Sequence, residues 1–72
     1  MSERIETQVP GNMWKVMVKK GDAVKAGDVL FIMEVMKTEV PHVAGIDGTV
    51  TEVRVSEGEE GLEAGIVAVV IS

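Results

Sequence analysis

The sequence of 72 residues contains no cysteine and no tyrosine, and only one histidine, one tryptophan and one phenylalanine. The absence of cysteine excludes disulfides, thiolate nucleophiles and thiolate metal sites. His42 is the only side chain that ordinarily titrates near neutral pH, which leaves little for acid–base catalysis or for a metal site built from several histidines. We therefore expect a protein that is not itself an enzyme and holds no metal.

Basic residues are scarce as well. Seven Lys and Arg stand against twelve Asp and Glu, which gives a net charge of −5 and disfavours a nucleic-acid partner. No apolar run approaches the roughly 18 residues of a membrane-spanning helix, and no signal-peptide core follows the charged residues 1–6. We expect a cytoplasmic protein with no membrane partner. Its length predicts one domain over residues 1–72 with one small core.

The apolar residues that are present favour β-strands. The chain has fourteen valines and five isoleucines but only two leucines, and its eight glycines divide it into short segments. One stretch, residues 28–40, contains no glycine or proline and places apolar residues at helical spacing. Periodicity alone does not decide between strand and helix for this stretch.

An internal repeat decides it. Residues 16–22 recur as residues 53–59, at an offset of 37, and Gly11 matches Gly48 at the same offset. Residues 26–29 recur as residues 64–67, at an offset of 38. Each copy contains a glycine, a strand, a turn with glycine and an acidic residue, an Ala-Gly pair and an apolar strand.

The second copy ends in residues 66–71, which are too short and too rich in β-branched residues for an independent helix. The matching stretch of the first copy, residues 29–34, is therefore predicted to be a strand as well. Residues 35–38 would then turn into a strand over residues 38–43, with Lys37 at the hairpin tip. A pseudo-two-fold relation between the copies predicts an all-β fold, a flattened barrel or sandwich of two small antiparallel sheets.

The segment Glu34-Val35-Met36-Lys37-Thr38, centred between two half-repeats that carry glycines, resembles the attachment hairpin of the biotinyl/lipoyl carrier domain family. The glycine pattern matches over nearly the whole chain, and the length is close to that of the small stand-alone attachment proteins of this family. The resemblance implies the family's "hammerhead" barrel. It also implies that Lys37 is the lysine joined to biotin or lipoate through its ε-amino group, with Glu34, Val35, Met36 and Thr38 as the flanking residues of the site.

The flanking residues favour biotin. Biotin carriers of this family usually have Glu-Ala-Met-Lys-Met, whereas lipoyl domains usually have Glu-Thr-Asp-Lys-Ala, and Met36 matches the former. The resemblance then implies a monomeric carrier that is modified by a biotin protein ligase. It would carry carboxybiotin between a biotin carboxylase and a carboxyltransferase.

Other functions remain open. The chain could carry lipoate in an oxo-acid dehydrogenase system, or accept both cofactors, or be an unmodified β-barrel module that only binds a partner. Other residues have simpler interpretations: Trp14 is expected as a half-buried core anchor and His42 as a partly exposed strand residue without a role. Four glutamates are expected to form a solvated loop surface: Glu57, Glu59, Glu60 and Glu63.

Overall fold

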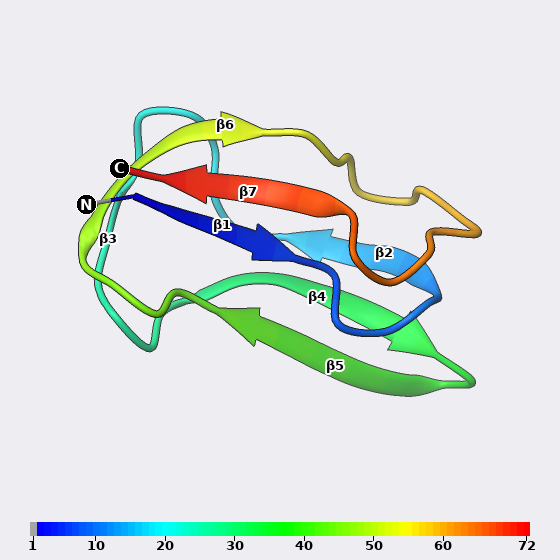
Figure 1. Ribbon diagram of the computed structural model, residues 1–72. Coiled ribbons are helices and arrows are strands. Elements are labelled where there is room, and N and C mark those ends of the chain that lie inside the picture. Colours follow the sequence, from blue (N-terminus) through cyan, green and yellow to red (C-terminus); the bar gives the residue numbers. More distant parts are fainter. Residues whose placement is uncertain (1) are drawn as a thin grey trace.

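The computed structural model describes residues 2–72, which form short strands joined by turns and loops (Figure 1). Valine and isoleucine dominate these strands because their branched side chains pack well on a pleated surface. No helix in the described residues is long and apolar enough to cross a membrane. The strands are β1 (Glu3–Glu6), β2 (Asn12–Val16), β3 (Ala23–Val24), β4 (Val29–Val35), β5 (Thr38–Val43), β6 (Gly48–Val53) and β7 (Val67–Ile71).

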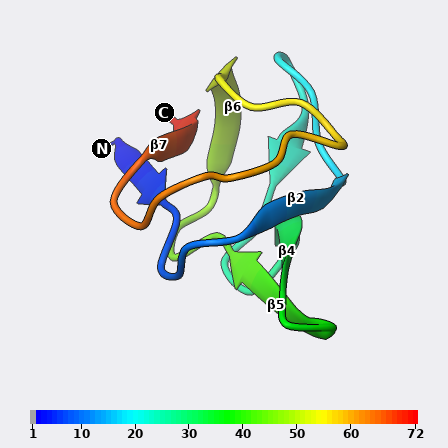
Figure 2. The same cartoon turned by 90° about the vertical axis from the view of Figure 1, so that its right-hand side faces the viewer.

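The strands form two antiparallel sheets that pack against each other. One sheet has the order β1-β7-β6-β3 and the other has the order β2-β4-β5. Figure 2 looks at the molecule from its hairpin end and shows the two sheets on opposite sides of the core. The predicted all-β fold of two small sheets is therefore confirmed, as are the strands predicted at residues 29–34 and 38–43.

The repeated sequence folds into repeated structure. In the first copy the backbone N–H of Lys19 donates to Asp22 Oδ2 at 2.9 Å, and in the second the N–H of Ser56 donates to Glu59 Oε1 at 3.0 Å. The third residue of each turn is a glycine with positive φ, 97° at Gly21 and 86° at Gly58. Since other residues are strained in this region, the Gly-acidic pairs mark two turns of the same type.

The structural correspondence between the two copies also includes strands whose sequences are not similar. At the same offset of 37, β1 corresponds to β5 and β2 to β6, while β4 corresponds to β7. Each sheet combines strands from both copies: β1 joins β7 and β6 of the second copy, and β5 joins β4 and β2 of the first. Neither copy therefore contains a complete sheet, and the two must fold together.

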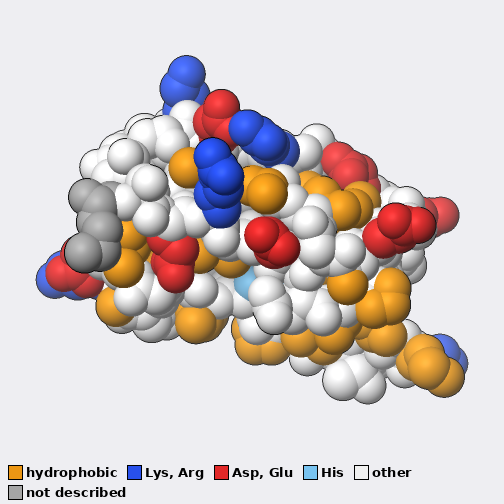
Figure 3. Space-filling view, in the orientation of Figure 1, with side chains coloured by type: hydrophobic (Ala, Val, Ile, Leu, Met, Phe, Trp, Pro, Cys, Tyr) orange, Lys and Arg blue, Asp and Glu red, His pale blue; other side chains and the backbone are white. Residues whose placement is uncertain are grey.

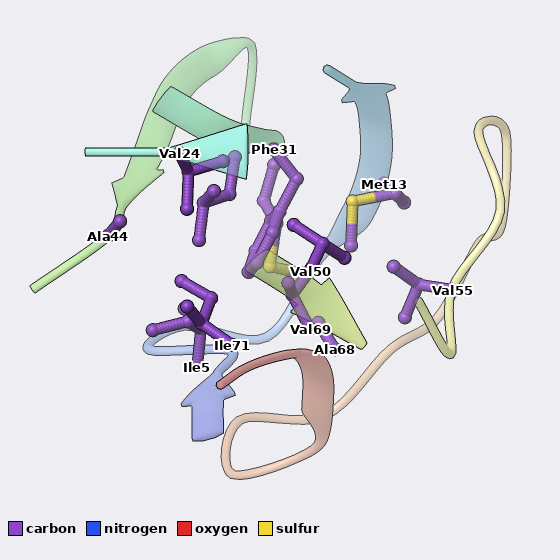
Figure 4. Close-up of a cluster of buried hydrophobic side chains, with 12 residues drawn as sticks. Ile5, Met13, Val24, Phe31, Ala44, Val50, Val55, Ala68, Val69 and Ile71 are labelled. Atoms are coloured by element: carbon purple, nitrogen blue, oxygen red, sulfur yellow. The ribbon is translucent and has the colours of Figure 1, made fainter. Parts of the chain in front are cut away.

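The space between the sheets is filled by apolar side chains of both copies (Figure 4). Each fully buried side chain of this size stabilises the fold by about 1.5–3 kcal/mol relative to an exposed one. The largest of these side chains lie beneath the β4–β5 hairpin or face it, so the packed core supports the base of the hairpin. The buried set is Ile5, Met13, Val24, Leu30, Phe31, Met33, Ala44, Val50, Val55, Ala68, Val69 and Ile71.

Candidate functional site at the β4–β5 hairpin

A two-residue turn made by Met36 and Lys37 connects β4 to β5. The backbone φ is 49° at Met36 and 67° at Lys37, and the pairing of Val35 with Thr38 closes the turn. Two successive positive φ values characterise a type I′ turn, whose twist matches that of the paired strands. Because neither residue is Gly or Asn, the turn is strained by roughly 1–2 kcal/mol per residue. The long β4–β5 ladder holds it in place.

The start of β2 packs against the neck of this hairpin at Gly11. A Cβ atom at this position would lie 2.5 Å from the carbonyl oxygen of Glu34 and 2.8 Å from Cγ2 of Val35. The φ of Gly11 is 155°, in the region that side chains rarely adopt. Gly11 also exchanges backbone hydrogen bonds with Leu62, of 2.9 and 2.8 Å. Glycine is therefore required here for the hairpin to be braced from the side.

The base of the hairpin is buried. Met33 on β4 pairs with Met13 on β2, and the side chains are 0% and 1% exposed. One step further from the tip, the rings of Phe31 and His42 stack with centroids 4.4 Å apart. Dense packing of this kind resists displacement, so the tip projects from a rigid support.

The tip itself is fully displayed. Met36 is 93% exposed, and Lys37 beside it is exposed as well. In Figure 3 the tip extends from the right-hand end of the molecule, with hydrophobic and basic atoms beyond the main body. The described residues enclose no pocket and include no group of three or more His, Asp or Glu side chains that could hold a metal ion. What the tip offers chemically is a primary amine, which in its neutral form is a nucleophile toward activated acyl groups.

Two glutamates flank the tip on the same face of the hairpin. Glu34 and Glu39 are directly opposite each other across β4 and β5. Like charges in this position destabilise a sheet by a few tenths of a kcal/mol. Neither carboxylate forms a salt bridge within residues 2–72, where the one salt bridge joins Arg54 to Glu52 at 2.7 Å.

The prediction that His42 is a partly exposed residue is wrong. Its side chain is 5% exposed, and its Nε2 accepts a 2.9 Å hydrogen bond from the backbone N–H of Gln8. Its Nδ1 lies 3.2 Å from the carbonyl oxygen of Val40, so this nitrogen carries the proton and the ring is neutral. Desolvation by burial lowers the pKa of His42, and the hydrogen bond to Val40 only partly opposes this. The ring is a structural element of the hairpin's base.

The prediction that Trp14 is an anchor in the core is also wrong. Trp14 is 41% exposed and lies in a bulge of β2, where the strand register shifts between Met13 and Lys15. Met13 occupies the core position instead, and the Lys15 ammonium lies 5.3 Å from the centre of the indole ring. The expectation rested on the fit of an indole to a partly covered pleated surface, which does not say to which side of the strand the ring points.

Two of the four glutamates expected on a solvated loop surface have structural contacts. Glu59 closes the second Gly-acidic turn, and Glu57 Oε1 accepts a 3.2 Å hydrogen bond from the backbone N–H of Val16. Glu60 and Glu63 are exposed, as expected. Sequence reasoning also missed the bracing contact of Gly11, although its match with Gly48 in the repeat was a usable signal. Gly48 likewise approaches Ile71 and Ser72 too closely for a Cβ atom.

Residues 2–71 match a family whose name joins biotin and lipoyl and whose description is "Biotin-requiring enzyme". The chain belongs to this biotin/lipoyl family. It is therefore a carrier domain of the kind to which biotin or lipoate is covalently attached, and such domains are not catalytic. The family and the barrel predicted from the sequence are both confirmed.

Individual relatives agree with this assignment. The "Biotinylated protein TB7.3 homolog" of Mycobacterium leprae is 39% identical over 72 residues, which is 100% of either chain. The "Biotin/lipoyl attachment protein" of Bacillus subtilis is 46% identical over 55 residues, 76% of this chain and 75% of that protein. The solved structure of Kluyveromyces lactis urea carboxylase superposes with a TM-score of 0.89 at 35% identity. That similarity covers 100% of this biotin/lipoyl domain but only 6% of the much longer carboxylase.

Proposed function

We propose that this chain is a biotin carrier in which biotin is attached through an amide bond to Nζ of Lys37. Bound biotin supplies carboxyl-group transfer, and the carrier moves that group between a biotin carboxylase and a carboxyltransferase. The observation that carries the proposal is the placement of Lys37 on a strained, rigidly supported turn beside a fully exposed Met36. We further propose that it acts as a cytoplasmic monomer.

The position of Lys37 separates it from the other four lysines of the chain. The ammonium of Lys15 lies over the Trp14 ring, and Lys19, Lys20 and Lys25 belong to loops that precede β3 or β4. Lys37 is the lysine at the tip of a hairpin that projects beyond the core. An arm on this lysine is therefore least obstructed by the domain, and tethering it there gives effective concentrations on the order of millimolar at nearby partner sites.

The tip also fits the attachment reaction. The neutral amine of Lys37 attacks the carbonyl carbon of the biotinyl-adenylate that a biotin protein ligase provides. The new C–N bond forms as the C–O bond to the phosphate breaks, AMP leaves with the electron pair, and the amine proton passes to solvent. Because no side chain of residues 2–72 forms a salt bridge with Lys37, no ion pair has to break before the amine reacts.

Met36 favours biotin over lipoate. It stands where lipoyl domains of the family carry an aspartate, and Glu34, Val35 and Thr38 complete the surface that a ligase would meet. The name of the M. leprae relative states biotinylation, whereas the B. subtilis name covers both cofactors. A carrier that accepts lipoate, alone or beside biotin, is therefore the second candidate, and an unmodified interaction module is the third.

The test is the intact mass, with peptide mapping, of the protein co-expressed with a biotin ligase in one culture and a lipoate ligase in another. Lys37→Arg is the critical variant, and Lys25→Arg, another exposed lysine in a loop, is its matched control. We expect one biotin adduct on Lys37 in the wild type and in the control, and none in Lys37→Arg.

A biotin adduct on Lys37→Arg would overturn the assignment of the site. Adducts in both cultures would identify an acceptor of both cofactors, whereas a lipoyl adduct alone would replace the biotin carrier by the lipoyl carrier. An unmodified wild type in both cultures would overturn the carrier function and favour the interaction module.

A further inference from the structure

The outer surfaces of the two sheets differ in chemistry. Side chains on a strand alternate between the core and the solvent, so each sheet has one outward face. The outward side chains of the β1-β7-β6 strands include the charged Arg4, Glu6, Glu52 and Arg54, all exposed; we call this surface the charged face. The corresponding surface of the β2-β4-β5 sheet, the apolar face, carries Met17, which follows β2, and Val29, Ile32, Pro41 and Val43. One exposed cation, Lys15 of β2, lies among them as the partner of Ile32.

The internal repeat allows a comparison position by position. At the offset of 37, Met17 corresponds to Arg54, and Val43 corresponds to Glu6. Met17 is 55% exposed and Val43 is 47% exposed, so neither side chain is needed to fill the core. Arg54 and Glu6 show that this backbone accepts a charge at each of the two positions. Exposed apolar side chains that gather on one face and that the fold does not require are typical of an interaction site.

The apolar face is also the surface that leads to Lys37. Its strands β4 and β5 are the two strands of the hairpin, and Figure 3 shows hydrophobic side chains along the lower margin of the molecule, over β5 and up to the tip. In the charged face the equivalent strands, β7 and β1, lead instead to the two chain ends, which lie at the opposite end of the molecule (Figure 1). The apolar face therefore runs along the hairpin from the pair Val29–Val43 at its far end, through Ile32–Pro41, to Glu34–Glu39 beside the tip. The charged face does not lead to the tip.

Two features define what could cover this face. Glu34 and Glu39 lie on its tip side without salt bridges in residues 2–72, so a complementary surface would carry a cation there. Pro41 lies on the edge strand β5 and has no backbone N–H to donate, which disfavours an added strand along that edge. The occupant should therefore contact the side chains of the face rather than extend the sheet.

We infer that the apolar face is the docking surface for the ligase that acylates Lys37, which presents an apolar patch with a basic residue opposite Glu34 and Glu39. This inference rests on the proposed function. A specific protein contact commonly covers about 800 Å² on each partner, and the turn of Met36 and Lys37 supplies only two side chains. An enzyme whose active site holds Nζ of Lys37 must therefore contact a neighbouring surface as well, and the apolar face extends from Glu34 and Glu39 beside the tip along the two strands of the hairpin.

The experiment exchanges residues between the two faces. The double variant Met17→Arg with Val43→Glu gives the apolar face the residues of the charged face, and the matched control Arg54→Met with Glu6→Val makes the reverse exchange. The first variant adds one charge of each sign and the second removes one of each sign, so both keep the net charge at −5. Initial rates of modification by purified biotin ligase, with biotin and ATP, are measured over a range of carrier concentrations. Circular dichroism and urea unfolding establish that each variant is folded.

We expect Met17→Arg with Val43→Glu to raise the KM for the carrier by about tenfold or more, with kcat little changed, because docking is lost while the tip is intact. The control should stay within about twofold of the wild type. If the double variant does not fold, Met17→Gln, which keeps the side-chain length, should still raise KM. An unchanged KM in a folded apolar-face variant, or an equal rise in the control, would overturn the inference while leaving the biotin carrier function intact.

Two further outcomes concern the occupant. Sedimentation of the wild type as a dimer, with Met17→Arg and Val43→Glu restoring the monomer, would assign the face to a second copy of this chain and overturn the inference. Absence of modification of the wild type by the biotin ligase would overturn the proposed function and this inference together. The two failures are therefore distinguishable by whether Lys37 of the wild type acquires biotin.

Discussion

The two halves of the chain, residues 2–35 and 38–72, follow the same path but present different surfaces. Where the backbone imposes a requirement the halves agree: Gly11 and Gly48 allow the same close approach, and Asp22 and Glu59 close the same turn. Where side chains face solvent the halves have diverged, and the divergence is largest on the apolar and charged faces. The shared positions therefore report the fold, and the differing positions report the function.

The halves also differ in how their last strand ends. In the first half, β4 continues through the strained turn into β5, whereas in the second half β7 leads to Ser72, which exchanges backbone hydrogen bonds of 2.8 and 2.9 Å with Thr49. Within residues 2–72, a two-residue turn joins β4 to β5, and their counterparts β7 and β1 pair without such a turn between them. The site lies at the link between the two halves.

The largest expected difference in stability between corresponding mutations in the two halves is at the paired glycines Gly11 and Gly48. Gly11→Ala should lower the free energy of unfolding by about 2–3 kcal/mol, because a Cβ atom would meet the Glu34 carbonyl at 2.5 Å in a positive-φ conformation. Gly48→Ala should cost about 1 kcal/mol, since its contacts with Ile71 and Ser72 are 2.8 Å and its φ is not positive. Urea unfolding of both variants measures this. Equal losses of stability in the two variants would show that the positive φ of Gly11 contributes nothing to the cost of Gly11→Ala.

The second comparison concerns a core position that is His42 in one half and Ile5 in the other. At pH 7, His42→Ile should cost about 1–2 kcal/mol, because the backbone N–H of Gln8 loses its acceptor. Burial lowers the pKa of His42 in the folded protein below 6.5. The unfolded chain then binds the proton more readily, so the histidine's contribution is present above about pH 6.5 and falls as the pH drops toward the folded pKa.

The stability difference between the wild type and His42→Ile should therefore narrow between pH 7 and pH 5. Thermal unfolding at several pH values measures it, and the acidic side chains that both proteins share cancel in the difference. Ile5→Val, a change at the matching position that does not titrate, is the control. A difference that stays constant over this pH range would contradict a lowered pKa for His42.

The smallest expected effect is at the paired turns. Asp22→Ala should cost about 1 kcal/mol and Glu59→Ala about 0.5 kcal/mol, because each removes one exposed hydrogen bond to a backbone N–H. The longer glutamate side chain loses more rotamer freedom when it forms the bond, which makes its net contribution smaller. Glu60→Ala, exposed and outside the turn, should change stability by less than about 0.3 kcal/mol. A larger loss for Glu59→Ala than for Asp22→Ala would contradict this order.

The sequence was sufficient to predict the architecture because the internal repeat combines weak local signals from the two copies. The strand at residues 29–34 could not be told from a helix by its own pattern, but its copy near the end of the chain was too short to be a helix. The turn with Lys37 followed from the position of the link between the copies. These inferences depend on spacing and turn chemistry, which local sequence encodes directly.

What the sequence did not predict depends on contacts between distant segments. The bulge that contains Trp14 is defined by the pairing of β2 with β4, and the burial of His42 depends on a hydrogen bond from Gln8 across the molecule. The burial of His42 could have been predicted, because extending the offset of 37 upstream places His42 at the position of the buried Ile5. The contrast of the two faces needed the strand register, which fixes which side chains point outward.

The antiparallel pairing of β1 with β7 joins Glu3 to Ile71, so the described chain begins and stops at neighbouring points. The hairpin tip lies at the other end of a body whose longest dimension is 33 Å. Such a geometry makes the domain easy to graft: it can be inserted into a surface loop of another protein, both junctions emerging together and the lysine pointing outward. Joining the two ends by a short linker and opening the chain elsewhere should likewise leave the hairpin in place.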